Sequence, residues 1–148
     1  MSYMKWFETH ANKHHDIVQK LSIQNYTKEM IIDYFFFENM VEKEPTFCLL
    51  YANKQKCHVI KSLNCYLCAC PYFRFNDEGL KEKEGLLHKS ACSINSKKSS
   101  YFRNKNIMHL DCSACLVPHT KTYISKHFDM NWKKIMHACL VGPQNYFN

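Results

Sequence analysis

The sequence predicts an α+β fold, in which a small, irregular, cysteine-rich module follows a helical hairpin and ends in a helix. Three observations indicate this arrangement. Residues 3–45 contain no cysteine and place apolar side chains at helical spacing. Residues 48–115 hold eight of the nine cysteines and show little regular periodicity, and helical spacing returns after Thr120. We therefore predict a helical N-terminal extension over residues 1–45 and a cysteine-rich domain with a C-terminal helix over residues 46–148.

The first helix is indicated by a stripe of side chains three and four residues apart: Trp6, His10, His14, Ile17 and Leu21. A second helix is expected after Thr27, which is a suitable N-cap, and before Pro45. Residues 32–37 are apolar nearly all round, so this helix is expected to be buried on most sides. His10 and His14 could chelate a metal from one helix face, but a solvated face is the favoured interpretation.

The central region offers two strand-like segments, residues 47–51 and 72–75, separated by polar stretches. Residues 81–84 and 93–105 are expected to be polar loops. The last helix is expected over residues 120–140, with Gly142-Pro143 as its stop signal.

Composition excludes several classes of protein. An apolar content of 46% is too high for a disordered chain, and three glycines leave no Gly-rich phosphate cradle. No segment approaches the roughly 20 apolar residues of a membrane span, and the first residues lack the apolar core of a signal peptide. We therefore expect a cytoplasmic protein, whose thiols in a reducing compartment bind metal or take part in chemistry rather than form disulfides.

The cysteines and two histidines form an ordered pattern. Cys57-His58 comes first, followed by Cys65-x-x-Cys68-x-Cys70-Pro71, then by Cys92, and finally by Cys112-x-x-Cys115-x-x-x-His119. Paired C-x-x-C units and a nearby histidine are typical of zinc sites. Cys70 is expected to point away from Cys65 and Cys68 in extended backbone and so to reach a second ion. A tetrahedral zinc site takes four ligands. Two such sites need eight ligands, so the nine candidates are enough for two zinc ions and leave one residue unused.

An iron–sulfur cluster is the main alternative, because clusters also use C-x-x-C spacing and a proline after a cluster cysteine. Zinc is favoured because the cysteines lack ferredoxin spacing and two histidines occupy ligand positions. In either case the ions would be chiefly structural, since an irregular module of this size needs cross-links to offset its ordering entropy. The expected fold is therefore a metal-stabilised α+β module.

The segment from Asn64 to Tyr72, preceded by Cys57-His58 and followed by Cys112-x-x-Cys115-x-x-Pro118-His119, resembles the cysteine-rich small domain family. This is a zinc-finger-like metal-binding family of bacteria and archaea that occurs alone or appended to cobamide-pathway enzymes. The resemblance covers residues 46–127 and implies that the nine residues of the pattern are motif positions: Cys57, His58, Cys65, Cys68, Cys70, Cys92, Cys112, Cys115 and His119. Family members often carry a further cysteine five residues before the Cys-His pair. This chain has Ala52 there, and Cys48 is a candidate replacement.

From the residues themselves, Cys48 and Cys139 are expected to be buried structural thiols. No motif activates any one cysteine as a nucleophile, so we predict no catalytic residue and favour a protein without independent enzymatic activity.

The net charge of +7 raises a second hypothesis. Cations and aromatic residues alternate in a pattern suited to phosphate contact and base stacking, at Lys97, Lys98, Tyr101, Phe102, Arg103 and Lys105. A solvated loop is the favoured interpretation, and an RNA- or tRNA-binding zinc module stays as an alternative.

The expected function is that of an accessory or adaptor protein holding two zinc ions, with an iron–sulfur redox or enzyme-associated role as the alternative. Its partner would be an unidentified protein or RNA and not a membrane. The resemblance adds a link to a cobamide-pathway enzyme.

Overall fold

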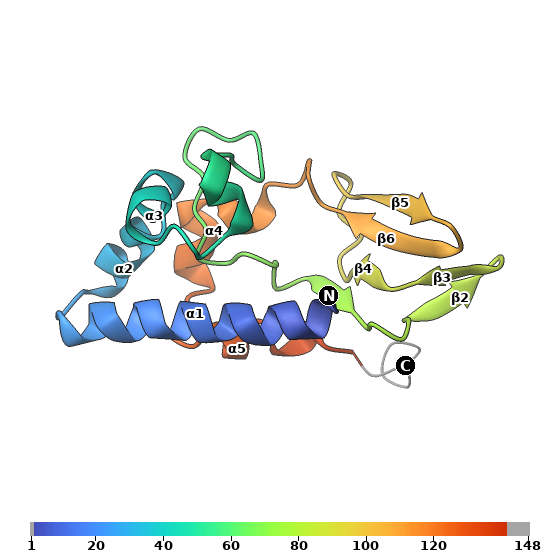
Figure 1. The fold of residues 1–148 in the computed structure, drawn as a ribbon, viewed down its shortest axis with the longest axis horizontal. Coiled ribbons are helices and arrows are strands. Elements are labelled where there is room, and N and C mark those ends of the chain that lie inside the picture. The colour runs from blue at the N-terminus through green and yellow to red at the C-terminus, as the bar shows by residue number, and fades with distance from the viewer. Residues whose placement is uncertain (1, 142–148) are drawn as a thin grey trace.

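A computed structural model describes residues 2–141 and shows a mixed fold, 40% helical and 18% strand. The helices gather at one end of an elongated molecule and most strands at the other (Figure 1). This segregation confirms the predicted α+β class. Within the described residues, no helix combines the length and the apolar character needed to cross a membrane.

Helix α1 (Tyr3–Ile23) confirms the first predicted helix and runs along the whole helical part of the molecule (Figure 1). Its N-cap is Ser2, whose hydroxyl accepts a hydrogen bond from the Lys5 N–H at 3.1 Å. The carboxylate of Asp77 accepts two more, from the N–H groups of Tyr3 at 2.9 Å and Met4 at 3.0 Å. The start of α1 is therefore fixed in part by a residue of the distant cysteine-rich region.

The second predicted helix is interrupted in the structure. Helix α2 (Lys28–Tyr34) begins at the predicted N-cap, where the Thr27 hydroxyl accepts from the Met30 N–H at 3.2 Å. Helix α3 (Phe37–Lys43) follows after Phe36, which is extended and bridges to Asn64. Expecting a single helix was wrong, because residues 63–65 pair with the backbone at this break.

Within residues 2–141, six short strands form two sheets: β1 (Phe73–Phe75), β2 (Lys81–Lys83), β3 (Leu86–His88), β4 (Ser90–Cys92), β5 (Ser100–Asn104) and β6 (Ile107–Asp111). Strands β1 and β4 pair antiparallel. The other four are ordered β2-β3-β6-β5, with β3 and β6 parallel and the outer pairs antiparallel. The Ser90 hydroxyl accepts from the Leu110 N–H at 2.8 Å and so links the two sheets.

The local expectations for the central region were correct in part. The strand predicted over residues 72–75 is confirmed as β1. Residues 47–51 do not form a strand, since a 3-10 helix spans Leu49–Asn53. The expected polar loops were wrong where they contain β2 and β5, whose polar side chains face solvent while their backbones pair with β3 and β6.

The predicted C-terminal helix is also interrupted. Helix α4 (Lys121–Lys126) begins at Thr120, whose hydroxyl accepts from the Tyr123 N–H, and α5 (Trp132–Ile135) follows. Asp129 turns the chain between them by accepting from the Asn131 N–H at 2.8 Å. The predicted stop signal at Gly142-Pro143 lies outside the described residues.

One hydrophobic core contains side chains from both sides of residue 45, among them Phe7, Leu21, Phe35, Tyr66 and Trp132. His10 and His14 lie in this core and are 3% and 0% exposed. The expectation of a solvated His10–His14 face was therefore wrong.

Candidate metal centre

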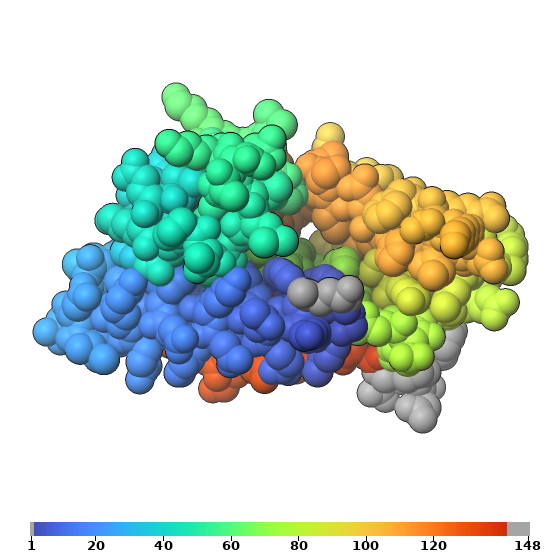
Figure 2. Space-filling view, viewed as in Figure 1, coloured from blue at the N-terminus to red at the C-terminus, as the bar shows by residue number. Residues whose placement is uncertain are grey.

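The structure brings the nine residues of the predicted ligand pattern together around two cavities. The larger cavity, of about 270 Å³, is lined by all of them except Cys65. The smaller, of about 40 Å³, is lined by Cys65 together with Cys57, Cys68 and His119. Because Cys57, Cys68 and His119 line both, the two cavities adjoin. Figure 2 shows a hollow where the green segment near residue 57 faces the orange segment near residue 112.

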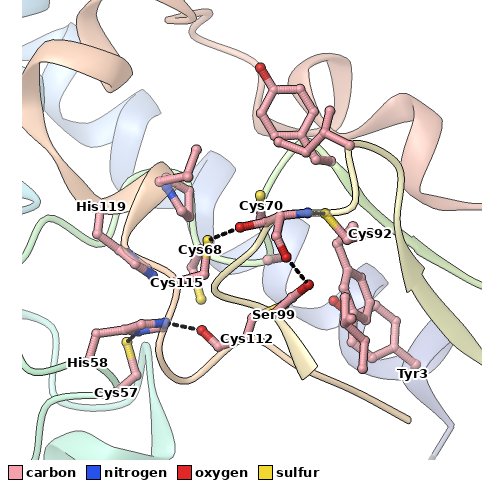
Figure 3. Close-up of a pocket in the computed structure, with 18 residues that line it drawn as sticks. Tyr3, Cys57, His58, Cys68, Cys70, Cys92, Ser99, Cys112, Cys115 and His119 are labelled. Carbon is pink, nitrogen blue, oxygen red and sulfur yellow. Dashed lines mark hydrogen bonds between the residues drawn. The ribbon is translucent and has the colours of Figure 1, made fainter. Parts of the chain in front are cut away.

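Cys57, His58 and His119 converge most closely, since the thiol and one nitrogen of each ring lie within 4.8 Å of one another. His58 Nδ1 lies 2.9 Å from Cys57 Sγ, and its Nε2 lies 2.8 Å from the backbone oxygen of Cys112 (Figure 3). His119 Nδ1 lies 3.1 Å from the backbone oxygen of Asn64. Rings that donate one N–H to a backbone carbonyl are held with the other nitrogen facing inward, as in many metal sites.

The Cys65–Cys70 segment turns sharply, and this turn separates its thiols. Ala69 and Cys70 have φ values of +90° and +61°, in the left-handed region that side-chain-bearing residues seldom adopt. The Cys70 N–H donates to the Leu67 oxygen at 3.0 Å and closes the turn. The expectation of extended backbone at Cys70 was wrong, and Cys70 lines the larger cavity together with Cys68 but not with Cys65.

We define the second thiol set as Cys70, Cys92, Cys112 and Cys115, which all line the larger cavity. Ser96 joins two of them, because its N–H donates to Cys92 Sγ at 3.5 Å and its hydroxyl hydrogen-bonds Cys115 Sγ at 3.4 Å. Burial raises the pKa of Cys112 to about 12, with nearby Cys70, Cys115 and Cys92 adding to the effect. These thiols therefore lie within electrostatic reach of one another.

The first thiol set comprises Cys48, Cys57, Cys65 and Cys68, which line the smaller cavity. Burial raises the pKa of Cys65 to about 12, and nearby Cys57 and Cys48 raise it further. Burial, followed by Cys65, Cys57 and Cys48, also raises the pKa of Cys68. Cys48 was expected to be a structural thiol, and the structure places it in this set.

The donor set fits a thiophilic ion. Thiolate and imidazole are the ligands that zinc takes in structural sites, and thiolates also hold iron–sulfur clusters. Burial, with neighbouring thiols adding to it, raises the pKa of Cys65 and Cys112, so an ion would have to displace their protons. N–H donors directed at sulfur, such as Ser96, stabilise the bound thiolate.

Sequence reasoning missed the structural role of Asn64. Its side chain is fully buried, donates to the Ile32 oxygen at 2.8 Å and accepts from the Tyr66 N–H at 2.9 Å. Its backbone N–H donates to the His119 oxygen at 3.1 Å. Asn64 therefore ties the Cys65 turn, the α2–α3 break and His119 together. The available signal was an Asn directly before a C-x-x-C unit, where Asx turns form.

None of the six residues predicted for nucleic-acid contact lines either cavity. Lys97 and Lys98 precede β5, and Tyr101, Phe102 and Arg103 lie on it. Tyr101 and Phe102 are exposed and, as successive strand residues, face opposite sides of the sheet. Phe102 stacks on His109, whereas Tyr101 meets His88 edge to face. Lys105, the sixth residue, lies in the β5–β6 turn, where its backbone oxygen accepts from Arg103 Nε at 2.6 Å. The two aromatics thus do not share one stacking face.

Cys139 behaves as the structural thiol that was expected. It is fully buried, and its thiol donates to the backbone oxygen of Cys70 at 3.4 Å.

Comparisons of this chain with protein-family models, with curated proteins and with solved structures found no match.

Proposed function

We propose that this protein is a metal-binding module that holds two zinc ions and acts as an accessory or adaptor protein. The observation that carries the proposal is the gathering of nine predicted ligands, from segments up to 62 residues apart in number (57 to 119), around two adjoining cavities. Nothing in ordinary core packing requires so many thiols at one place. Two bound ions would explain why these thiols and imidazoles lie together, because both are zinc ligands.

The proposed ions have a structural task. The ligand residues lie mainly in turns and connections between the short strands and helices. Such segments bury little apolar area of their own, so an ion that joins them supplies folding free energy. The imidazoles of His58 and His119 beside Cys57 would serve either as nitrogen ligands or as N–H donors to a bound thiolate.

The accessory role is supported by the resemblance of the cysteine pattern to the cysteine-rich small domain family. We propose membership of that family, and with it a partner among cobamide-pathway enzymes. No motif in the chain activates a nucleophile, which favours a non-catalytic role.

Elemental analysis of anaerobically purified protein tests the proposal. We expect about two zinc ions per chain and no visible absorption band. The double variant Cys112→Ala/Cys115→Ala should keep only one ion, whereas Cys139→Ala, which removes a buried thiol outside both sets, should keep both.

Two outcomes would contradict the proposal. A brown preparation that contains iron and inorganic sulfide would replace zinc by an iron–sulfur cluster. Protein that is folded, free of metal and unable to take up zinc or iron would overturn metal binding altogether.

A further inference from the structure

A further cavity lies beside the metal centre, where the first turn of α1 meets the strand part of the molecule (Figure 1). Its volume of about 640 Å³ is within the range of ligand-binding pockets. None of the described residues that line it is a cysteine. We call it the aromatic groove, because six of its lining residues carry rings: Tyr3, Trp6, Phe73, Phe75, Phe102 and His109.

The rings of the aromatic groove come from a helix and from a sheet, and neighbouring rings hold them in place. Trp6 of α1 stacks on His10, with the ring centroids 4.7 Å apart and the planes 17° apart. Phe102 of β5 pairs with His109 of β6 in the sheet register, and their rings stack at 5.2 Å. Phe102 is nevertheless 51% exposed. The groove therefore offers positioned ring faces to a planar ligand.

The charge that faces the aromatic groove is positive. Lys89 lines it and is half-buried, and both backbone groups of this residue are hydrogen-bonded. Within residues 2–141 the Lys89 ammonium forms no ion pair. Asp77 is the one acidic residue among the described residues of the groove, and its two carboxylate oxygens accept from the N–H groups of Tyr3 and Met4. A half-buried cation without a carboxylate partner favours an anionic ligand.

Ser90 adds a hydrogen-bond donor next to this cation. It lines the groove and is 5% exposed, and its hydroxyl accepts from the Leu110 N–H at 2.8 Å. A hydroxyl can also donate its own hydrogen, and in the described part of the chain no acceptor receives it. Ring faces, one cation and one donor together match a heteroaromatic base that is attached to a phosphate.

We propose that the aromatic groove binds single-stranded nucleic acid, with a base stacked on Phe102 and a phosphate contacted by Lys89. Every base has a face for stacking, and only a single strand leaves that face open. The net charge of +7 adds a general attraction for the phosphate backbone. This inference goes beyond the proposed function and depends on none of the proposed metal ligands.

Strand β5 provides a matched pair of substitutions for the test. Tyr101 and Phe102 are adjacent exposed aromatics that face opposite sides of the sheet, and only Phe102 lines the groove. The probe is an end-labelled, mixed-sequence single-stranded RNA of about 12 nucleotides, since binding sites for single strands span about 4–16. Fluorescence anisotropy should show that Phe102→Ala weakens binding about tenfold, whereas Tyr101→Ala leaves it unchanged. The zinc content of each variant should equal that of the wild-type protein.

Lys89→Gln tests the phosphate contact. It should weaken binding and reduce the slope of log affinity against log salt concentration by about one. An unchanged slope would contradict the contact between Lys89 and a phosphate.

A labelled strand of the same length without bases separates stacking from charge. We expect the wild-type protein to bind it about tenfold more weakly than the RNA, and Phe102→Ala to leave this weaker binding unchanged. Equal affinity for the two strands, equal losses in Phe102→Ala and Tyr101→Ala, or no binding of RNA would overturn the inference. The proposed function would then still stand, because metal content tests it separately. Should Phe102→Ala not fold, the comparison of the two strands on wild-type protein decides the matter.

Discussion

At the scale of single residues, His10 and His14 are the clearest departure from expectation. Their spacing with Trp6, Ile17 and Leu21 placed them correctly on one helix face, but their polarity suggested that the face was solvated. In the structure His14 stacks on Phe35 at 4.8 Å, and its Nε2 donates to the Tyr66 oxygen at 3.0 Å. His14 Nδ1 and His10 Nε2 are buried without a hydrogen-bond partner in the described part of the chain, so aromatic packing surrounds rings whose hydrogen bonding is incomplete.

Burial makes these histidines sensitive to acid. Burial first, and then the Lys13 charge, lowers the pKa of His10 to about 4, and burial and His10 lower that of His14 to about 3. The unfolded chain, with a pKa near 6.5, binds more protons below that pH. The stability that the neutral rings contribute is therefore present above pH ~6.5 and is lost as the pH falls through about 4 and about 3.

As the pH falls, the free energy of unfolding of the variant His10→Phe should decrease less than that of the wild-type protein. One pKa unit corresponds to about 1.4 kcal/mol, so the lowered pKa of His10 corresponds to about 3 kcal/mol. Between pH 7 and pH 4 the free energy of unfolding of the wild-type protein should therefore fall by about that much more than that of the variant. Urea unfolding at each pH measures this difference. His15→Gln, on the exposed face of α1, is the control. An identical pH dependence in His10→Phe and wild type would contradict the assignment.

At the scale of elements, helix ends were predictable where a local side chain sets them. Thr27 caps α2 as expected, and the structure shows that Thr120 caps α4 in the same way. Breaks within helices were not predictable, because residues distant in sequence cause them. The interruption between α2 and α3 lets Phe37 N–H donate to the Leu63 oxygen and lets Cys65 N–H donate to the Phe35 oxygen.

The start of α1 illustrates the same dependence and is open to test. Asp77 accepts from the N–H groups of Tyr3 and Met4, where a carboxylate also interacts favourably with the helix dipole. Asp77→Ala should therefore lower the free energy of unfolding by about 1 kcal/mol, measured by denaturant titration. The exposed neighbour Glu78→Ala should change it little. Equal effects of the two substitutions would show that the cap does not stabilise α1.

At the scale of the whole molecule, apolar packing is concentrated in the helical part. Over residues 76–111, which include five of the six strands, the buried apolar side chains are Leu80, Ala91 and Leu110. Strand β5 is exposed along its length. The helical part instead contains Phe7, Ile32, Trp132 and most of the shared core. The strands have little burial to offset their ordering entropy, so other links must hold them.

Removal of the proposed ions should therefore affect the two parts unequally. After chelation, amide hydrogen exchange should accelerate first in β4, β5 and β6, because Cys92 ends β4 and Cys112 and Cys115 follow β6, while amides of α1 keep most of their protection. Mass spectrometry of exchanged peptides measures this. The reverse order, with α1 exposed before the strands, would contradict a structural role for the ions in the strand region.

The sequence by itself determined the α+β class, the first helix, the Thr27 cap of α2 and the set of nine ligand candidates. These depend on spacing and on neighbours within a few residues, where short-range geometry dominates. Only the tertiary structure decided that His10 and His14 are buried, that two predicted helices are interrupted, and that Cys48 lies with Cys65 and Cys68. Each of these depends on which distant segments pack together, because burial and electrostatic contact are properties of proximity in space and not of order along the chain.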